Sequence, residues 1–132
     1  MRIAQELLDA IVEHARRDAP NECCGMVATT RDGVALSVHP TTNVEASPFR
    51  FKIGEQELYD TYMGIEDAGN EVGAIYHSHT RSDPYPSQTD VAFAERWPGV
   101  EWLIVGLKGD VEVRSFLIDD HGVITEVPVE RG

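Results

Sequence analysis

The stretch EVGAIYHSHTRSDPYPSQTD, residues 71–90, carries most of the information about the fold of this chain. It begins with a nearly continuous apolar run that turns polar at its end. Such a run predicts a central strand over 71–79, buried on both faces of a sheet. A loop with two prolines follows, and then Ser87, a residue type favoured at the N-terminus of a helix. We therefore predict a strand, a loop and a helix over 71–97, in that order.

The flanking segments predict an α/β fold, in which a mixed β-sheet is flanked by helices. Apolar residues at helical spacing predict one helix from Ile3 to a stop at Pro20 and another over 54–70. Two short β-like runs around Asp32-Gly33 predict a hairpin. No repeat or linker interrupts the chain, so a single domain over 1–132 is expected. The remaining apolar runs predict strands at 49–53, 100–109, 110–119 and 122–129.

Composition and charge narrow the functional classes. Hydrophobic residues make up 42% of the 132 residues, which is enough for a packed core. The net charge of −12 weighs against nucleic acid or an anionic membrane as a partner, because both attract positive charge. No apolar run approaches the roughly 20 residues that span a bilayer, and the first residues do not resemble a secretory signal. A cytoplasmic location is therefore expected.

Two adjacent cysteines, Cys23 and Cys24, stand in no CxxC spacing. Vicinal cysteines rarely bridge each other, and disulfides are rare in the cytosol. At least one of the two is expected to be a small buried side chain, with zinc ligation or nucleophilic catalysis as the alternative.

His77 and His79 are two positions apart on the predicted strand, so their side chains project from the same face at its end. If Ser87 caps the next helix, Asp90 lies in its first turn and is able to point back toward the imidazoles. Two imidazoles and one carboxylate suit Zn2+, and three protein ligands with an open fourth position are typical of a catalytic site. The alternative is structural: polar residues at a strand end, an aspartate that stabilises the helix dipole, and a serine that only caps.

A family resemblance joins these residues. The order His77-Ser78-His79, seven residues, Ser87, two residues, Asp90 resembles the H-S-H-x7-S-x2-D signature of the JAMM (MPN+) metalloproteases. Those enzymes also have a glutamate far upstream, and the run PNECCG over 20–25 matches the form seen in bacterial members, with Glu22 as that glutamate. Similarity to the bacterial Mec-type branch of the family extends over the whole chain.

The resemblance implies the JAMM fold, which is similar to that of cytidine deaminases. It implies that His77, His79 and Asp90 are the zinc ligands. It implies that Glu22 is the base that takes a proton from the attacking water and passes it to the leaving amine, and that Ser87 stabilises the oxyanion. The implied substrate is a small ubiquitin-like sulfur carrier protein ending in Gly-Gly (CysO-like), from whose terminal glycine cysteine is released during cysteine biosynthesis.

Two other interpretations stay open. A broader JAMM peptidase or isopeptidase would process the C-terminal tails of ubiquitin-like or sulfur carrier proteins. A catalytically inactive MPN scaffold would only bind partners, although such domains typically lack one or more of the ligands that this chain has. A carrier tail is expected to lie extended between the segments 43–51 and 80–86. The sequence leaves open the identity of the carrier and whether the chain forms a homodimer.

Overall fold

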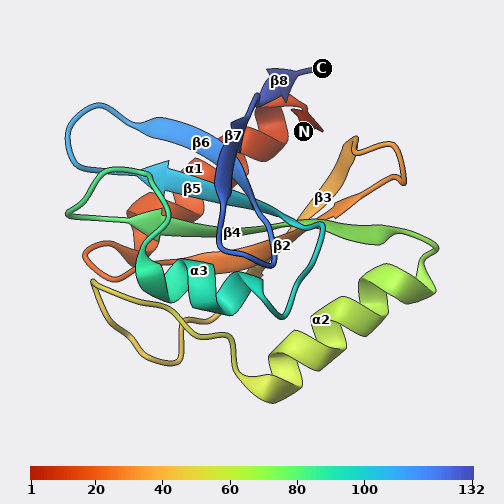
Figure 1. Ribbon diagram of the computed structural model, residues 1–132, viewed down its shortest axis with the longest axis horizontal. Helices are drawn as coiled ribbons and strands as arrows, with labels where there is room; N and C mark the ends of the chain where they lie inside the picture. The colour runs from red at the N-terminus through yellow and green to blue at the C-terminus, as the bar shows by residue number, and fades with distance from the viewer.

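The computed structural model describes residues 1–132 and contains a six-stranded mixed sheet with the strand order β3-β2-β4-β5-β6-β7 (Figure 1). β4 (Glu71–His79) lies inside this sheet, antiparallel to β2 (Cys24–Thr29) and parallel to β5 (Glu101–Gly106). The predicted central strand is therefore confirmed. The other strands of the sheet are β3 (Ala35–Thr41), β6 (Glu112–Ile118) and β7 (Ile124–Val127).

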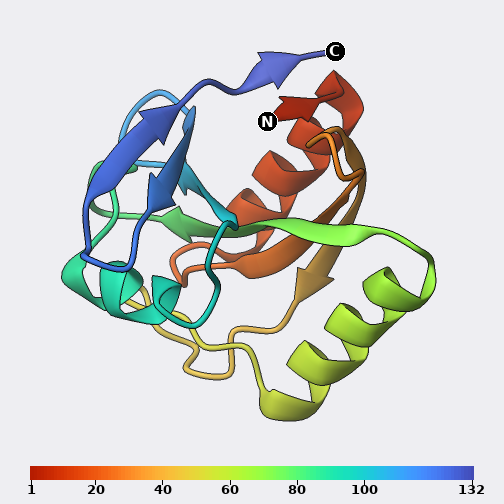
Figure 2. The same ribbon diagram turned by 45° about the vertical axis from the view of Figure 1, so that its right-hand side comes forward.

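Helices cover both faces of the sheet (Figures 1 and 2). α1 (Gln5–Asp18) packs on one face, and α2 (Glu55–Asp67) and α3 (Gln88–Ala94) pack on the other. This arrangement follows from the alternation of side chains along β4, since Tyr76 joins the core beneath α1 and Ile75 joins the core beneath α2 and α3. The predicted α/β fold with a mixed sheet between helices is confirmed. None of the helices has the length and apolar character needed to cross a bilayer.

The predicted hairpin is also confirmed. β2 and β3 pair antiparallel from Cys24 opposite Thr41 to Thr29 opposite Ala35. The connecting turn contains Gly33 with φ +83°, a backbone conformation that glycine adopts without steric cost.

The start of the first helix is predicted wrongly. Residues Arg2–Ile3 form the short strand β1, which pairs parallel with β8 (Glu130–Arg131), and α1 begins only at Gln5. The two ends of the chain consequently lie side by side (Figure 2). A contact between segments more than a hundred residues apart leaves no trace in the local spacing of apolar residues, which is why the sequence does not reveal it.

The predicted strand at 49–53 is wrong as well. Only one isolated bridge, between Asn43 and Ile53, is present there. The Asn43 side chain takes the place of a neighbouring strand, because it donates to the carbonyl of Arg50 (3.0 Å) and accepts from the N–H of Lys52 (3.0 Å). The alternating apolar residues belong instead to a loop, from which Phe51 and Ile53 enter the core.

Candidate metal centre and active site

The end of β4 brings two imidazoles and a carboxylate together on the side of the sheet that α3 covers. The Nε2 atoms of His77 and His79 are 3.1 Å apart. Oδ2 of Asp90 lies 3.1 Å from Nε2 of His77 and 3.3 Å from Nε2 of His79. All three side chains are buried. The sequence pattern predicted that His77, His79 and Asp90 lie close together, and the structure confirms this.

The first turn of α3 explains how Asp90 reaches this position. Ser87 Oγ accepts the N–H of Asp90 (3.1 Å), and the N–H of Ser87 donates to Asp90 Oδ2 (2.9 Å). This reciprocal pair is a capping box, so the predicted helix cap is confirmed. α3 itself ends at Ala94, earlier than the predicted 97.

The electrostatics of the three atoms favour a cation between them. His79 Nδ1 donates to the carbonyl of Asp83 (2.8 Å), which leaves the lone pair of a neutral His79 ring at Nε2. The two Nε2 atoms and Asp90 Oδ2 form three close pairs, but with no proton on His79 Nε2 these pairs cannot all be hydrogen bonds. Ligands bound at 2.0–2.1 Å in a tetrahedral site lie about 3.3 Å apart, close to the separations seen here. The donor set and its spacing therefore fit a small divalent metal ion.

The carboxylate of Asp90 is strongly biased toward its ionised form. Burial alone would raise its pKa, but the adjacent His77 and His79 rings and the Ser87 N–H together hold the pKa well below its usual range. Burial would likewise lower the pKa of His79, but its contacts with Asp90 and Asp83 outweigh this and raise it.

Glu22 borders the same centre from the loop that precedes β2. One carboxylate oxygen of Glu22, one ring nitrogen of His77 and one ring nitrogen of His79 all lie within 4.8 Å of one another. Glu22 is 4% exposed, and burial raises its pKa to about 7, although the two imidazoles oppose that rise. A carboxylate with such a pKa both accepts and releases a proton near neutral pH. Glu22 and Asp90 are both buried carboxylates, but the pKa of Glu22 is raised and that of Asp90 is lowered.

Three residues that the sequence does not single out shape this site. Phe51 stacks on the His77 ring at a centroid distance of 4.6 Å. Asn43 Nδ2 donates to the carbonyl of Glu22 (3.0 Å), and the N–H of Glu22 donates to the carbonyl of Ser47 (2.8 Å). All three come from the loop predicted as a wall of the substrate groove, and no local pattern distinguishes them from other loop residues.

The two predicted groove walls both border the site and also contact one another. The Arg81 guanidinium lies over the Phe49 ring at 5.4 Å, and Thr80 Oγ1, whose shorter bond is to the carbonyl of Pro20 (3.0 Å), also lies 3.4 Å from the carbonyl of Pro48. Phe49 is 70% exposed, so the rim formed by these two segments has an accessible aromatic side chain.

The cysteines do not take part in this centre. Both are buried and unpaired. Burial raises the pKa of Cys23 to about 12 and that of Cys24 to about 11, so both thiols stay protonated and unreactive. The prediction that at least one is a small buried side chain is confirmed.

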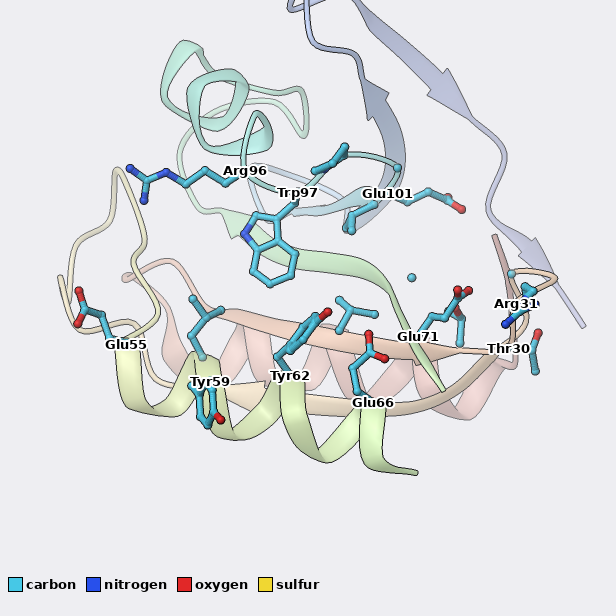
Figure 3. A pocket seen from close by; sticks show the side chains of 18 residues that line it. Thr30, Arg31, Glu55, Tyr59, Tyr62, Glu66, Glu71, Arg96, Trp97 and Glu101 are labelled. Carbon is cyan, nitrogen blue, oxygen red and sulfur yellow. The ribbon is translucent and has the colours of Figure 1, made fainter. Parts of the chain in front are cut away.

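A cleft of about 850 Å³ lies elsewhere, near the beginning of β4, between α2 and the loop before β5 (Figure 3). Tyr62 of α2 and Trp97 of that loop face each other across it, with ring centroids 5.9 Å apart. Its lining contains several carboxylates but no histidine, no cysteine and none of the predicted site residues. The predicted site residues lie at the opposite end of β4.

Comparisons with known proteins place the chain in a family. Residues 4–119 match the family model described as prokaryotic homologs of the JAB domain. The chain is 38% identical over 130 residues to the CysO-cysteine peptidase of Mycobacterium tuberculosis, which covers 96% of this chain and 88% of the relative. It is 34% identical over 126 residues to the desampylase of Haloferax volcanii, with coverage of 91% and 90%.

Solved structures agree on the fold. A solution structure of a Desulfitobacterium hafniense protein superposes with a TM-score of 0.85 at 27% identity, covering 99% of this chain and 92% of the other. A JAB1/MPN domain protein from Archaeoglobus fulgidus superposes with a TM-score of 0.64 at 22% identity, with coverage of 99% and 98%. The second likeness concerns the fold alone.

Proposed function

The chain belongs to the family of prokaryotic JAB-domain proteins, and from this membership we propose that it is a zinc-dependent hydrolase acting as a single domain over residues 1–132. It cleaves the amide between the C-terminal glycine of a ubiquitin-like sulfur carrier protein and cysteine, and so releases cysteine for biosynthesis. The observation that carries this proposal is the convergence of His77, His79 and Asp90 beside the buried Glu22. The similarity to a CysO-cysteine peptidase supports the choice of substrate.

We assign the ligands to His77, His79 and Asp90. Asp90 Oδ2 is within 3.3 Å of both imidazole Nε2 atoms, and its pKa is held below the usual range, so it supplies a negative charge at neutral pH. Glu22 also lies near both rings, but its raised pKa suits proton transfer better than ligation. Two nitrogens and one oxygen are typical of zinc, which when bound activates a water and polarises the substrate carbonyl.

The residues of the chain then divide the hydrolysis between them. Glu22 takes a proton from the water as its oxygen attacks the carbonyl carbon of the terminal glycine. The same carboxyl group passes that proton to the amine nitrogen as the C–N bond breaks, which yields the carrier carboxylate and free cysteine. The hydroxyl of Ser87 keeps a proton to donate, because its oxygen is the acceptor in the helix cap. That proton stabilises the developing oxyanion.

A broader deconjugase is the second candidate, and the similarity to desampylases favours it. Such an enzyme would release a lysine-linked protein from the carrier tail as readily as cysteine. An inactive scaffold is disfavoured, because every residue needed for ligation and proton transfer is present and gathered in one place.

The substrate assignment predicts a clear order of kcat/KM values. A folded carrier ending in Gly-Gly–Cys should be hydrolysed best, because a stiff, narrow groove accepts glycine where a Cβ would clash. The same carrier ending in Ala-Ala–Cys and the free tail peptide should each be at least about tenfold poorer, the peptide because it lacks a docking surface and preorganisation.

A fourth substrate distinguishes the two candidates. The carrier linked through its terminal glycine to a lysine side chain should be slow if cysteine is the preferred leaving group. Equal kcat/KM values for the cysteine and lysine conjugates would instead establish the broader deconjugase. Equal values for all four substrates would leave only a general peptidase.

Replacing Ser87 should have two separable effects. Ser87→Ala removes the helix cap, which should lower the free energy of unfolding by about 0.5–2 kcal/mol. It should also lower kcat by about 10²–10³ if the hydroxyl stabilises the oxyanion. Ser87→Asp serves as the control, because aspartate caps a helix but has no proton to donate when ionised. A loss of melting temperature without a loss of kcat in Ser87→Ala would reduce Ser87 to a cap.

A further inference from the structure

The residues that alternate with the two histidines have partners of their own. Ser78 lies on the opposite side of β4 from the metal centre and is completely buried. Its Oγ accepts the N–H of Cys23 (2.8 Å), and its own N–H donates to the carbonyl of Cys23 (3.3 Å). Two residues further on, Thr80 Oγ1 donates to the carbonyl of Pro20 (3.0 Å). Both partners belong to the loop that carries Glu22.

This loop has no secondary structure to hold it. α1 ends at Asp18 and β2 begins at Cys24, so Glu22 lies outside both elements. The bonds of Ser78 and Thr80 attach the chain on either side of Glu22 to the end of β4 and to the residue that follows it. Together with the bonds from the loop at Ser47 and Asn43, they leave the main chain of Glu22 little freedom.

We propose that Ser78, assisted by Thr80, is a positioning residue that holds Glu22 at the distance from the imidazoles that proton transfer requires. This inference rests on the proposed function. The end of β4 and the residue that follows it then have two roles: His77 and His79 hold the metal, and Ser78 and Thr80 hold the loop that carries the base. The partners of the buried Ser78 hydroxyl, the N–H and the thiol of Cys23, both belong to the residue next to Glu22.

The expected signature is a loss of kcat with metal binding intact. Ser78→Ala leaves the buried N–H of Cys23 without its acceptor, so the loop can move and carry Glu22 with it. A displacement of about 1 Å is enough to cost up to about 10²-fold in rate, so kcat should fall 10- to 100-fold. KM should change less than about twofold, because the groove walls are not altered. Zinc content should stay unchanged, since Ser78 contacts none of the three ligands.

Matched variants separate positioning from general stability. Ser115→Ala removes another completely buried serine, whose Oγ bonds to Glu101 away from the centre, and should leave kcat unchanged. Ser78→Thr keeps the hydroxyl and should restore kcat. Thr80→Val and Thr80→Ser form an independent pair at a half-buried position. Because Thr80 also lies in a predicted groove wall, this pair is compared by amide hydrogen exchange and not by kcat: only the valine variant should speed exchange at Glu22, and this pair decides the matter if a Ser78 variant does not fold.

Amide hydrogen exchange in the metal-free protein gives a second readout that does not depend on activity. In Ser78→Ala the amides of Cys23 and Glu22 should both exchange at least about tenfold faster, while that of Val27 within β2 stays protected. The Glu22 amide is informative because it bonds to Ser47 and not to Ser78.

Two results would overturn the inference. One is an unchanged kcat in Ser78→Ala with a lowered melting temperature, as expected of a purely structural serine. The other is faster exchange at Cys23 alone, with Glu22 still protected. If the wild-type protein hydrolyses no carrier conjugate, the proposed function fails, and the exchange at Glu22 still decides whether Ser78 holds that residue.

Discussion

Glu22→Gln is expected to lower kcat by about 10²–10⁴ while the protein stays folded and keeps its metal. Glutamine has nearly the same shape as glutamate but cannot accept a proton from water or return one to the leaving amine. The main-chain bonds of residue 22 to Ser47 and Asn43 do not depend on the side chain, so the loop should keep its position. The measurements are kcat for the carrier–cysteine conjugate and zinc per chain by metal analysis.

Glu101→Gln is the matched control for this variant. Glu101 is a half-buried carboxylate on β5, and its Oε1 accepts a hydrogen bond from Ser115 at a distance from the metal centre. Its replacement should leave kcat unchanged. Full activity in Glu22→Gln would refute the role of Glu22 as the base, and a loss of zinc in that variant would make Glu22 a metal ligand.

His77→Ala is expected to remove the bound zinc and, with it, the hydrolytic activity. Loss of even an outer partner of a metal ligand typically costs 10- to 100-fold in affinity, so loss of a ligand should exceed about 100-fold. The stacked Phe51 ring would also lose its partner, so some loss of stability should accompany the loss of metal. Titration of the metal-free protein with Zn2+ measures the affinity directly.

His14→Ala controls for the loss of a buried imidazole. His14 is 4% exposed and bonds to the hydroxyl of Tyr76 (2.6 Å) beneath α1, on the other face of the sheet. This variant should be destabilised and still bind one zinc ion. A His77→Ala protein with a full complement of zinc would show that the metal is held by other residues.

The sequence by itself determined those features that depend on neighbours in the chain. The apolar run before His77 predicted a strand buried on both faces, because a strand inside a sheet covered by helices has no solvent-exposed side. The period of two along a strand placed His77 and His79 on one face. The preference of serine for helix N-termini predicted that Ser87 caps α3. Asp90 is only three residues further along, so its place in the first turn of that helix was predicted with it.

Family resemblance supplied what local patterns could not. Glu22 lies in an irregular loop, and an isolated glutamate there is indistinguishable from an ordinary surface carboxylate. Its burial, and hence its pKa of about 7, depends on tertiary packing, in which the loop at Asn43 and Ser47 bonds to its main chain. The alternating pattern at 49–53 was misread for a related reason, since the same loop satisfies its backbone with the Asn43 side chain and not with a neighbouring strand.

Only the tertiary structure decided which distant segments meet. The pairing of β1 with β8, the stacking of Phe51 on His77 and the bonds from Ser78 to Cys23 each join residues far apart in the chain. Such contacts depend on how the sheet and helices pack as a whole, because a hydrogen bond or a ring stack requires a partner at a defined distance. Local spacing determines which way a side chain points, whereas tertiary packing determines which residues it contacts. The shared face of the two imidazoles is a consequence of the first, and the buried Glu22 carboxylate beside them is a consequence of the second.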